Sequence, residues 1–523
     1  MALDPEFSAV ENEIDNAFRD LALIRTAGRD NALWHLVAAV DHSMAAALQQ
    51  PGGPHRQAAF ADTLVNAMRP AVEWIENGCR AEGSIPTAVD IDRFQQATEL
   101  LDLGVQYLDF TAIFPYAHRR IVSLSIQKDH LVATHTLADE PRFEVYNRLH
   151  AVRGTDSLDL LKRIDRLIAD RLSQRRSPRA IALDPSLIAS AAMAIATARE
   201  RHEHLPPSWQ FFGIELGEFH QVSDALRAIV FVYQVIIAIG RFAAAPFTIT
   251  RSELIDAVHA STGVKRRAIR PVLDLLTYGS LKEIRHADPA LQPILPLRAG
   301  PYVLSTTLLS AAAAERNLIA LANLVATERS AYMKETDGKE ALMRRRIAEA
   351  GPSFRSWHGT IPGRPDLGDL DLVLIDETSR SLLLLELKYF IDPAEVRELL
   401  NKTEELKTGV ARTQKRLAAF QDDPLLLTRS LGIEAGYRVA GAVVSANWIG
   451  LAGVQAADVP IINEQHLCQQ LAGKTELRST IEWLETRRYL PFSGDFEIVP
   501  TTARVGRWSA DWYRVAIRAN AFG

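Results

Sequence analysis

Apolar residues recur every three or four positions along much of the first 224 residues, the spacing that lines up one face of a helix. Between two such stretches, residues 121–137 alternate apolar and polar side chains around Lys128 and Asp129, which is typical of a β-hairpin. We therefore predict a mainly helical region over residues 8–224 with a small hairpin near residues 120–146. The helical stretches are residues 32–48, 92–108, 157–174 and 187–205.

Residues 225–310 form a second block, in which two helical stretches separated by a turn precede two strands around a polar loop. Thr250 or Ser252 can cap the first helix, and Gly263 lies in the turn. This order predicts a winged-helix domain, whose second helix would enter the major groove of DNA. A small helical connector with a solvated basic face is the alternative interpretation. The candidate nucleic-acid contacts at the start of the second helix are Lys265, Arg266, Arg267 and Arg270.

The pattern changes after a long helix that we expect from Thr307 to Tyr332, within a connecting segment of residues 311–336. From residue 337 to residue 490 the order is helix, strand, strand, helix, strand, and this alternation indicates an α/β domain. Residues 491–523 form a C-terminal extension. For it we expect an amphipathic closing helix that carries the aromatic residues Trp508, Trp512 and Tyr513.

Two strands of the predicted α/β domain, in the stretch GDLDLVLIDETSRSLLLLELKYF, carry charges within apolar runs. A symmetric four-residue loop over residues 377–380 would pair Asp376 with Ser381. Because side chains alternate along a strand, that register decides which charged residues share a face. A slip of one residue would separate them.

In that register Asp371 faces Glu386 and Asp369 faces Lys388, all on one side of the sheet. Two buried carboxylates at this separation repel each other, and a divalent cation would offset the repulsion. Hard oxygen ligands favour Mg²⁺, with Mn²⁺ as a substitute. The expected site therefore hydrolyses a phosphodiester with a metal ion held by Asp371 and Glu386, and Lys388 orients a water or a phosphate oxygen.

These strands resemble the core of the PD-(D/E)xK nuclease superfamily, the restriction-endonuclease-like fold, in which an acid on one strand precedes E-x-K on the next. Asp371 matches the acid, Asp369 lies where many members carry another, and Glu386 and Lys388 match E-x-K. A Pro-Asp pair at 365–366 lies outside the predicted strand, so Asp371 is preferred as the ligand. The resemblance covers the C-terminal part alone and implies a central mixed sheet flanked by helices.

The resemblance also implies residues on two helices. Glu340 begins the helix before the first core strand, and Gln414 lies on the helix after E-x-K, where many members carry a glutamate and a glutamine. Arg412, Lys415 and Arg416 surround Gln414 and could contact backbone phosphates. The alternatives are a helix-opening glutamate, a solvated helix face, and a buried ion-pair cluster in an ordinary α/β domain.

Charge, cysteine content and apolar runs limit the partners and the cellular compartment that we expect for this protein. The net charge of −5 over 523 residues gives no global basic field, so a nucleic-acid partner would be held by a local patch or through metal ions. Two distant cysteines, Cys79 and Cys468, argue against a disulfide scaffold. No secretory signal is visible, and the apolar run from Ala228 to Gly240 is too short to span a membrane. We expect a cytoplasmic protein with no membrane partner.

Two functions are consistent with these observations. The first is a Mg²⁺-dependent endonuclease acting on DNA, of the kind found in bacterial restriction or phage defence. The second is a non-catalytic nucleic-acid-binding regulator with a vestigial nuclease fold. A homodimer and an activating protein partner are both compatible with either function, as is RNA in place of DNA.

Overall fold

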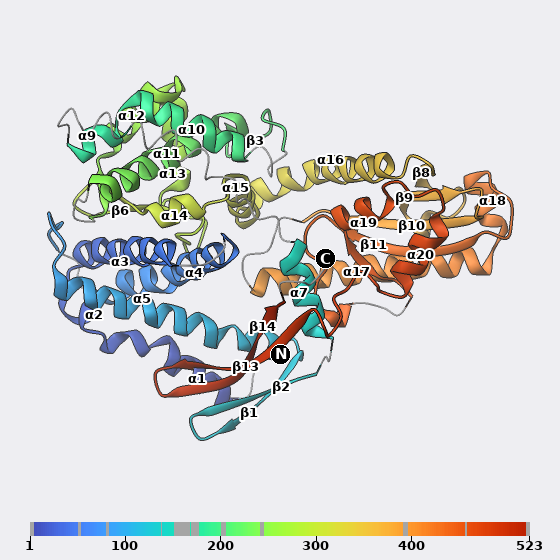
Figure 1. Ribbon diagram of the computed structural model, residues 1–523, viewed down its shortest axis with the longest axis horizontal. Coiled ribbons are helices and arrows are strands. Elements are labelled where there is room, and N and C mark those ends of the chain that lie inside the picture. The colour runs from blue at the N-terminus through green and yellow to red at the C-terminus, as the bar shows by residue number, and fades with distance from the viewer. Residues whose placement is uncertain are drawn as a thin grey trace.

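The computed structural model describes residues 5–50, 54–79, 83–136, 139–150, 168, 177–199, 205–240, 245–390, 396–454 and 458–518. The protein is multidomain and mostly helical, and in the described part of the chain the strands form two mixed and two antiparallel sheets (Figure 1). The helix expected at residues 157–174 lies almost entirely outside the described residues.

The N-terminal region is helical, as its apolar spacing predicts. Helices α3, α4 and α5 pack around a core that includes Trp34, Met68 and Leu100. Asp90 caps α5 by accepting the backbone N–H of Arg93 at 3.1 Å. The helices of this region are α1 (Pro5–Asp15), η1 (Ala17–Asp20), α2 (Ala22–Thr26), α3 (Arg29–Gln49), α4 (Pro54–Gly78), α5 (Ile91–Thr111) and α6 (Ile113–His118).

The predicted hairpin is present as β1 (Val122–Gln127) and β2 (His130–His135), with Gln127 paired to His130. Its sheet is completed by the other end of the chain, because β14 (Trp508–Ile517) pairs with β2 and with β13 (Phe496–Val505). The expected C-terminal helix is therefore wrong. Ten residues on each side of the turn at Gly506 pair in one continuous antiparallel ladder, from Phe496 opposite Ile517 to Val505 opposite Trp508.

The middle of the chain contains a second helical core around α11 (Leu216–Gly240). By length and composition Leu216–Ala238 could cross a membrane, but 56% of its apolar window is buried within the protein. It packs against α10 and α9 as the central helix of this core, which is consistent with a soluble protein. The neighbouring elements are α9 (Pro178–Ala182), α10 (Pro185–Arg199), β3 (Gln210–Phe211) and β4 (Ile214–Glu215).

Two helices and three short strands follow in the predicted order. Thr250 caps α12 in a reciprocal capping box with Glu253, and Gly263 ends that helix with φ 74°. The antiparallel sheet has the order β5-β7-β6, so an additional strand before the helices joins the two predicted ones. The elements are β5 (Phe247–Ile249), α12 (Arg251–Thr262), α13 (Arg266–Leu276), β6 (Ile294–Pro296) and β7 (Tyr302–Leu304).

The long helix expected from Thr307 to Tyr332 is wrong in its bounds. The chain forms α14 (Thr306–Ala311), α15 (Ala314–Leu324) and α16 (Ala326–Ala350). The expected polar break near residue 337 lies inside α16, which runs from the middle helices to the C-terminal sheet (Figure 1). Its polar residues did not end the helix because Glu, Lys and Arg are good helix formers, and one Gly weakens a helix without breaking it.

The C-terminal α/β layer is a five-stranded mixed sheet in the order β12-β11-β10-β9-β8. β8, β9 and β10 are antiparallel, whereas β10, β11 and β12 are parallel. The edge strands β8 and β12 are short and were not predicted. The elements are β8 (Arg355–Thr360), η2 (Pro365–Leu367), β9 (Asp369–Asp376), β10 (Ser381–Lys388), α17 (Val396–Asp422), α18 (Leu425–Leu431), β11 (Arg438–Ser445), η3 (Ala452–Val454), β12 (Ile461–Asn463), α19 (Glu464–Leu471) and α20 (Leu477–Glu485).

Helix α7 (Glu140–His150) packs on this sheet although it precedes it by more than two hundred residues. Phe143 and Tyr146 belong to the same apolar cluster as the strands of the sheet. Asn147 accepts the backbone N–H of Ile449 at 2.9 Å and donates to the carbonyl of Gly450 at 3.2 Å. Residues 8–224 therefore contribute to several hydrophobic cores.

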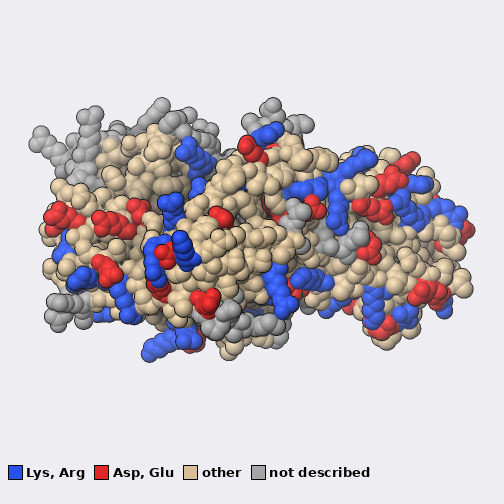
Figure 2. Space-filling model, turned by 90° about the horizontal axis from the view of Figure 1, so that it is seen from below, with Lys and Arg blue, Asp and Glu red and all other residues tan. Residues whose placement is uncertain are grey.

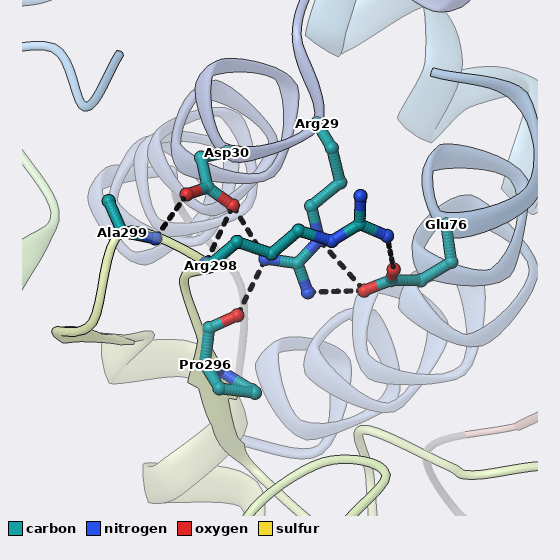
Figure 3. A network of polar contacts seen from close by, with 6 residues as sticks. All are labelled: Arg29, Asp30, Glu76, Pro296, Arg298 and Ala299. Carbon is teal, nitrogen blue, oxygen red and sulfur yellow. Dashed lines mark hydrogen bonds and ion pairs between the residues drawn. The ribbon is translucent and has the colours of Figure 1, made fainter. Parts of the chain in front are cut away.

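A buried polar network joins the N-terminal helices to the turn between β6 and β7 (Figure 3). Asp30, which is buried, accepts the backbone N–H groups of Arg298 and Ala299 at 3.0 Å each. Arg29 donates to Asp30 at 2.7 Å, to the carbonyl of Pro296 at 2.6 Å and to Glu76. The guanidinium thus pairs with the buried carboxylate of Asp30 and the partly buried carboxylate of Glu76, and it fixes the turn against α3.

We predict that Asp30→Ala lowers the free energy of unfolding by about 3 kcal/mol, because the backbone N–H groups of Arg298 and Ala299 lose their acceptor and the buried Arg29 loses one of its two carboxylate partners. Differential scanning calorimetry, with amide exchange at Arg298 and Ala299, measures the effect. Arg298→Ala is the matched control, since it keeps the backbone bond and removes an ion pair with Glu76 at 3.6 Å whose arginine is half exposed. Equal destabilisation by both variants would contradict the role of Asp30.

Candidate catalytic site in the five-stranded sheet

The β9–β10 register is the one that the four-residue loop predicts. Ser381 pairs with Asp376, and the ladder continues to Leu385 opposite Leu372, so Asp371 and Glu386 are the next pair. Asp376 stabilises the turn, because its carboxylate accepts the N–H groups of Thr378 at 2.9 Å and Ser379 at 3.1 Å. The register of the hairpin thus follows from its own local sequence.

The ladder ends at the charged pair because a side chain replaces the next backbone bond. Asp371 Oδ2 accepts the backbone N–H of Leu387 at 2.8 Å. Asp369 lies beyond this point and pairs with Thr360 on β8, whose hydroxyl donates to its carboxylate at 2.8 Å. The predicted pairing of Asp369 with Lys388 is therefore absent from the ladder.

A cavity of about 420 Å³ opens beside these strands. It is lined by charged groups of both signs from α16, η2, β9, β10 and α17. The charged residues that the sequence predicts for this site therefore lie around one cavity, whereas the predicted Gln414 does not. The charged residues that line the cavity are Glu340, Asp366, Asp369, Asp371, Glu386, Lys388, Arg412, Lys415 and Arg416.

Glu386 is the most deeply buried of these acids, with 2% of its surface exposed. Three cations surround its carboxylate: Lys388 Nζ lies 2.8 Å from Oε1, Arg412 Nη1 lies 3.5 Å from Oε1, and Arg416 Nη1 binds Oε2. Burial raises the pKa of Glu386, but Lys388 and Arg416 outweigh it and the net shift is downward. Glu386 is therefore ionised at neutral pH.

The pKa of Asp371 shifts in the opposite direction to that of Glu386. Burial and the neighbouring charge of Glu386 raise the pKa of Asp371 to about 6, against smaller opposing effects of the Leu387 N–H, Lys388 and Arg416. Two facing carboxylates with pKa values shifted in opposite directions are a common arrangement in sites that hold a proton or a cation.

Helix α17 supplies the cations through its periodicity. Arg412, Lys415 and Arg416 are three and four residues apart and share one face, whereas Gln414 is turned about 160–200° away from Arg412 and Arg416. Gln414 donates to Asp458 at 2.9 Å and does not line the cavity. The structure therefore does not bring Gln414 together with Asp371 and Glu386, and its role stays a prediction.

The segment before β9 is held by α17. Lys415 donates to the carbonyl of Asp366 at 2.6 Å, and Arg416 donates to the carbonyls of Leu367 at 3.1 Å and Asp369 at 2.5 Å. Asp366 itself is exposed outside the strand and pairs with Arg364 at 2.9 Å. One residue at the site was not predicted from the sequence. Arg344 of α16, four residues after Glu340, donates to the backbone carbonyl of Asp371 at 2.6 Å.

The second predicted site is exposed on α13. Lys265, Arg266, Arg267 and Arg270 all face solvent. Arg266 pairs with Asp256 at 2.9 Å. These residues lie on a different module from the cavity.

Whether the cavity suits a metal ion depends on its donors. Within the described residues, no group of three or more His, Cys, Asp or Glu side chains is arranged to hold one. Mg²⁺ needs fewer protein side chains, because it is commonly bound through one or two carboxylates with water and phosphate oxygens as the other ligands. Asp371 and Glu386 fit that donor set, provided that Oε1 of Glu386 exchanges Lys388 or the exposed Arg412 for the ion.

Comparison with known proteins adds no relative: no family model, curated protein or solved structure matches this chain. The assignment of the site therefore depends on its own geometry and charges.

We predict that the metal-free protein loses stability as Asp371 ionises. Between the ordinary carboxyl pKa of 3.8 and the folded value of about 6, the folded state binds more protons than the unfolded state, so the free energy of unfolding falls as pH rises. Relative to Asp371→Asn, the wild type should lose about 2–3 kcal/mol between pH 4 and pH 7. Urea titrations in the presence of a chelator measure this difference, and parallel pH profiles would contradict it.

Proposed function

We propose that this protein is a metal-dependent nuclease. The observation that supports it best is the facing pair Asp371 and Glu386, with Lys388 on the same face, beside a cavity that α17 lines with three cations. Carboxylates recruit a divalent ion, and arginine and lysine side chains attract a phosphate backbone. Sites that hydrolyse or transfer phosphate esters commonly combine both kinds of group in one cavity.

In this proposal Asp371 and Glu386 hold a Mg²⁺ or Mn²⁺ ion. The ion would polarise the phosphorus centre and lower the pKa of the attacking water. Lys388 orients the water or steadies a phosphate oxygen, while Arg412 and Lys415, both exposed, contact the flanking backbone. Glu340 contributes a further carboxylate at the wall formed by α16.

The fold supports the same proposal. A five-stranded mixed sheet with the acids on adjacent antiparallel strands, preceded by α16 and followed by α17, is the arrangement expected of a restriction-endonuclease-like domain. The order α11-β5-α12-α13-β6-β7 matches a winged helix, in which α13 would be the recognition helix. Lysine and arginine are interspersed with acids on the face shown in Figure 2. The proposed nucleic-acid binding therefore depends on a local contact surface and not on overall charge.

Duplex DNA is the proposed substrate, because α13 presents exposed cations at the end that enters the major groove in winged helices. We also propose a cytoplasmic role in restriction or phage defence, with an activating partner or a second copy of the chain, because the proposed nuclease layer is combined with large additional modules. A non-catalytic DNA-binding regulator is the second candidate. It is favoured by the three cations around Glu386, which neutralise the carboxylate without any metal.

We predict Mg²⁺-dependent cleavage of plasmid DNA that Asp371→Asn and Lys388→Ala each reduce by about 100-fold or more, as expected when one electrostatic group of a reaction centre is removed. Asp366→Asn is the matched control, since this carboxylate lines the same cavity but is exposed outside the strand; it should retain nearly the wild-type rate. Gel assays of nicked and linear products provide the rates.

Equal cleavage by all four proteins would eliminate this site as the reaction centre. If none cleaves, calorimetric titration with Mn²⁺ separates the two candidates. A nuclease site takes up the ion and loses it in Glu386→Gln, whereas the vestigial fold takes up none.

We predict that α13 contacts DNA phosphates. Arg267→Ala with Arg270→Ala should weaken binding and reduce the slope of log K against log salt by up to about 2, because each lost phosphate contact removes roughly 0.9. Fluorescence anisotropy at several salt concentrations measures the slope. The control is Arg478→Ala with Arg488→Ala, which removes the same charge from exposed positions near α20. The proposal fails if the two double variants have the same slope.

A further inference from the structure

Arg416 on α17 donates to three acceptors in two separate parts of the chain, the entry to β9 and the strand β10. Its Nη1 donates to Glu386 Oε2, its Nε donates to the carbonyl of Leu367 at 3.1 Å, and its Nη2 donates to the carbonyl of Asp369 at 2.5 Å. Its side chain is only 6% exposed. The guanidinium is therefore directed inward, and its hydrogen bonds are made with protein groups.

These acceptors include one carboxylate of the pair, Glu386, and the backbone that leads to the other, Asp371. Glu386 lies within the apolar strand β10, where a carboxylate without a partner would be costly. Leu367 and Asp369 flank Gly368, whose φ of 64° turns the chain into β9, and Asp371 follows two residues later. One side chain thus fixes the carboxylate of Glu386 and the start of the strand that carries Asp371.

The two neighbouring cations differ from Arg416 in exposure. The side chains of Arg412 and Lys415 are 58% and 55% exposed. Arg412 lies 3.5 Å from Oε1 of Glu386, on the same helix face and one turn before Arg416. It can exchange its partner for solvent or a ligand, whereas Arg416 would have to give up three hydrogen bonds, two of them buried and one partly buried.

We propose that Arg416 is a positioning residue that orients Glu386 toward Asp371, and that it does not contact the nucleic-acid backbone. The inference depends on the proposed nuclease function for its catalytic consequence. Oε2 of Glu386 stays with Arg416, and Oε1 is the oxygen whose partners, Lys388 and Arg412, can be replaced. The planar fork of an arginine suits this role, because a lysine keeps the charge but cannot bond three acceptors in these directions.

The test compares Arg416→Lys and Arg416→Gln with the matched pair Arg412→Lys and Arg412→Gln in steady-state cleavage. Both Arg416 variants should lower kcat by about 10–100-fold, the usual effect of removing a group that orients a site ligand, with KM close to the wild-type value. Arg412→Gln should instead raise KM, and Arg412→Lys should restore it, because a phosphate contact needs the charge more than the fork.

A second measurement does not depend on activity. In the metal-free and DNA-free protein, amide exchange at Leu367 to Asp369 and at Leu387 should accelerate in both Arg416 variants and stay unchanged in both Arg412 variants. Circular dichroism of each variant establishes that the fold is retained, and Arg416→Lys is the milder change if Arg416→Gln unfolds.

Three results would overturn the inference: near wild-type kcat in Arg416→Lys, a raised KM with unchanged kcat in Arg416→Gln, or unchanged amide exchange in both. The first would mean that the charge alone matters, and the second that Arg416 contacts phosphate. If the wild type neither cleaves DNA nor binds Mn²⁺, the nuclease proposal fails, whereas amide exchange still decides whether Arg416 holds the two segments.

Discussion

The arrangement of the α/β layer depends on one buried charge, the carboxylate of Glu386. The strand that carries it is apolar on both faces, so the carboxylate can remain ionised only if cations reach it inside the protein. Lys388 comes from the same strand, and Arg416 and Arg412 come from α17. The position of α17 on β10 and β11 is therefore an electrostatic requirement as well as a packing contact.

That requirement extends to the loop before β9. Because Arg416 also bonds the carbonyls of Leu367 and Asp369, the side chain that neutralises Glu386 also fixes the residues leading to Asp371. At the other end of the hairpin, Asp376 binds the turn and accepts the N–H of Leu477 at the start of α20. The hairpin is thus held at both ends, which keeps the two carboxylates in register.

The modules around the sheet are interleaved in sequence. Helix α7 packs on the sheet, the final strands complete the β1–β2 sheet, and α16 extends from the middle helices to the cavity wall. Buried Lys339 on α16 lies 3.9 Å from Glu315 of α15 and precedes Glu340. An isolated segment of residues 337–490 would therefore lack part of its core.

The β9–β10 hairpin and its register could be predicted from the sequence, because strand alternation and loop length are local properties. The sequence also determined the α12–α13 pair, whose cap and turn are encoded within a few residues. The pairing of β14 with β2 was not predictable from any local pattern, because the two strands lie nearly four hundred residues apart along the chain. Tertiary structure also turned Gln414 toward Asp458 and Arg416 toward Glu386, because the docking of α17 decides which helix face meets the sheet.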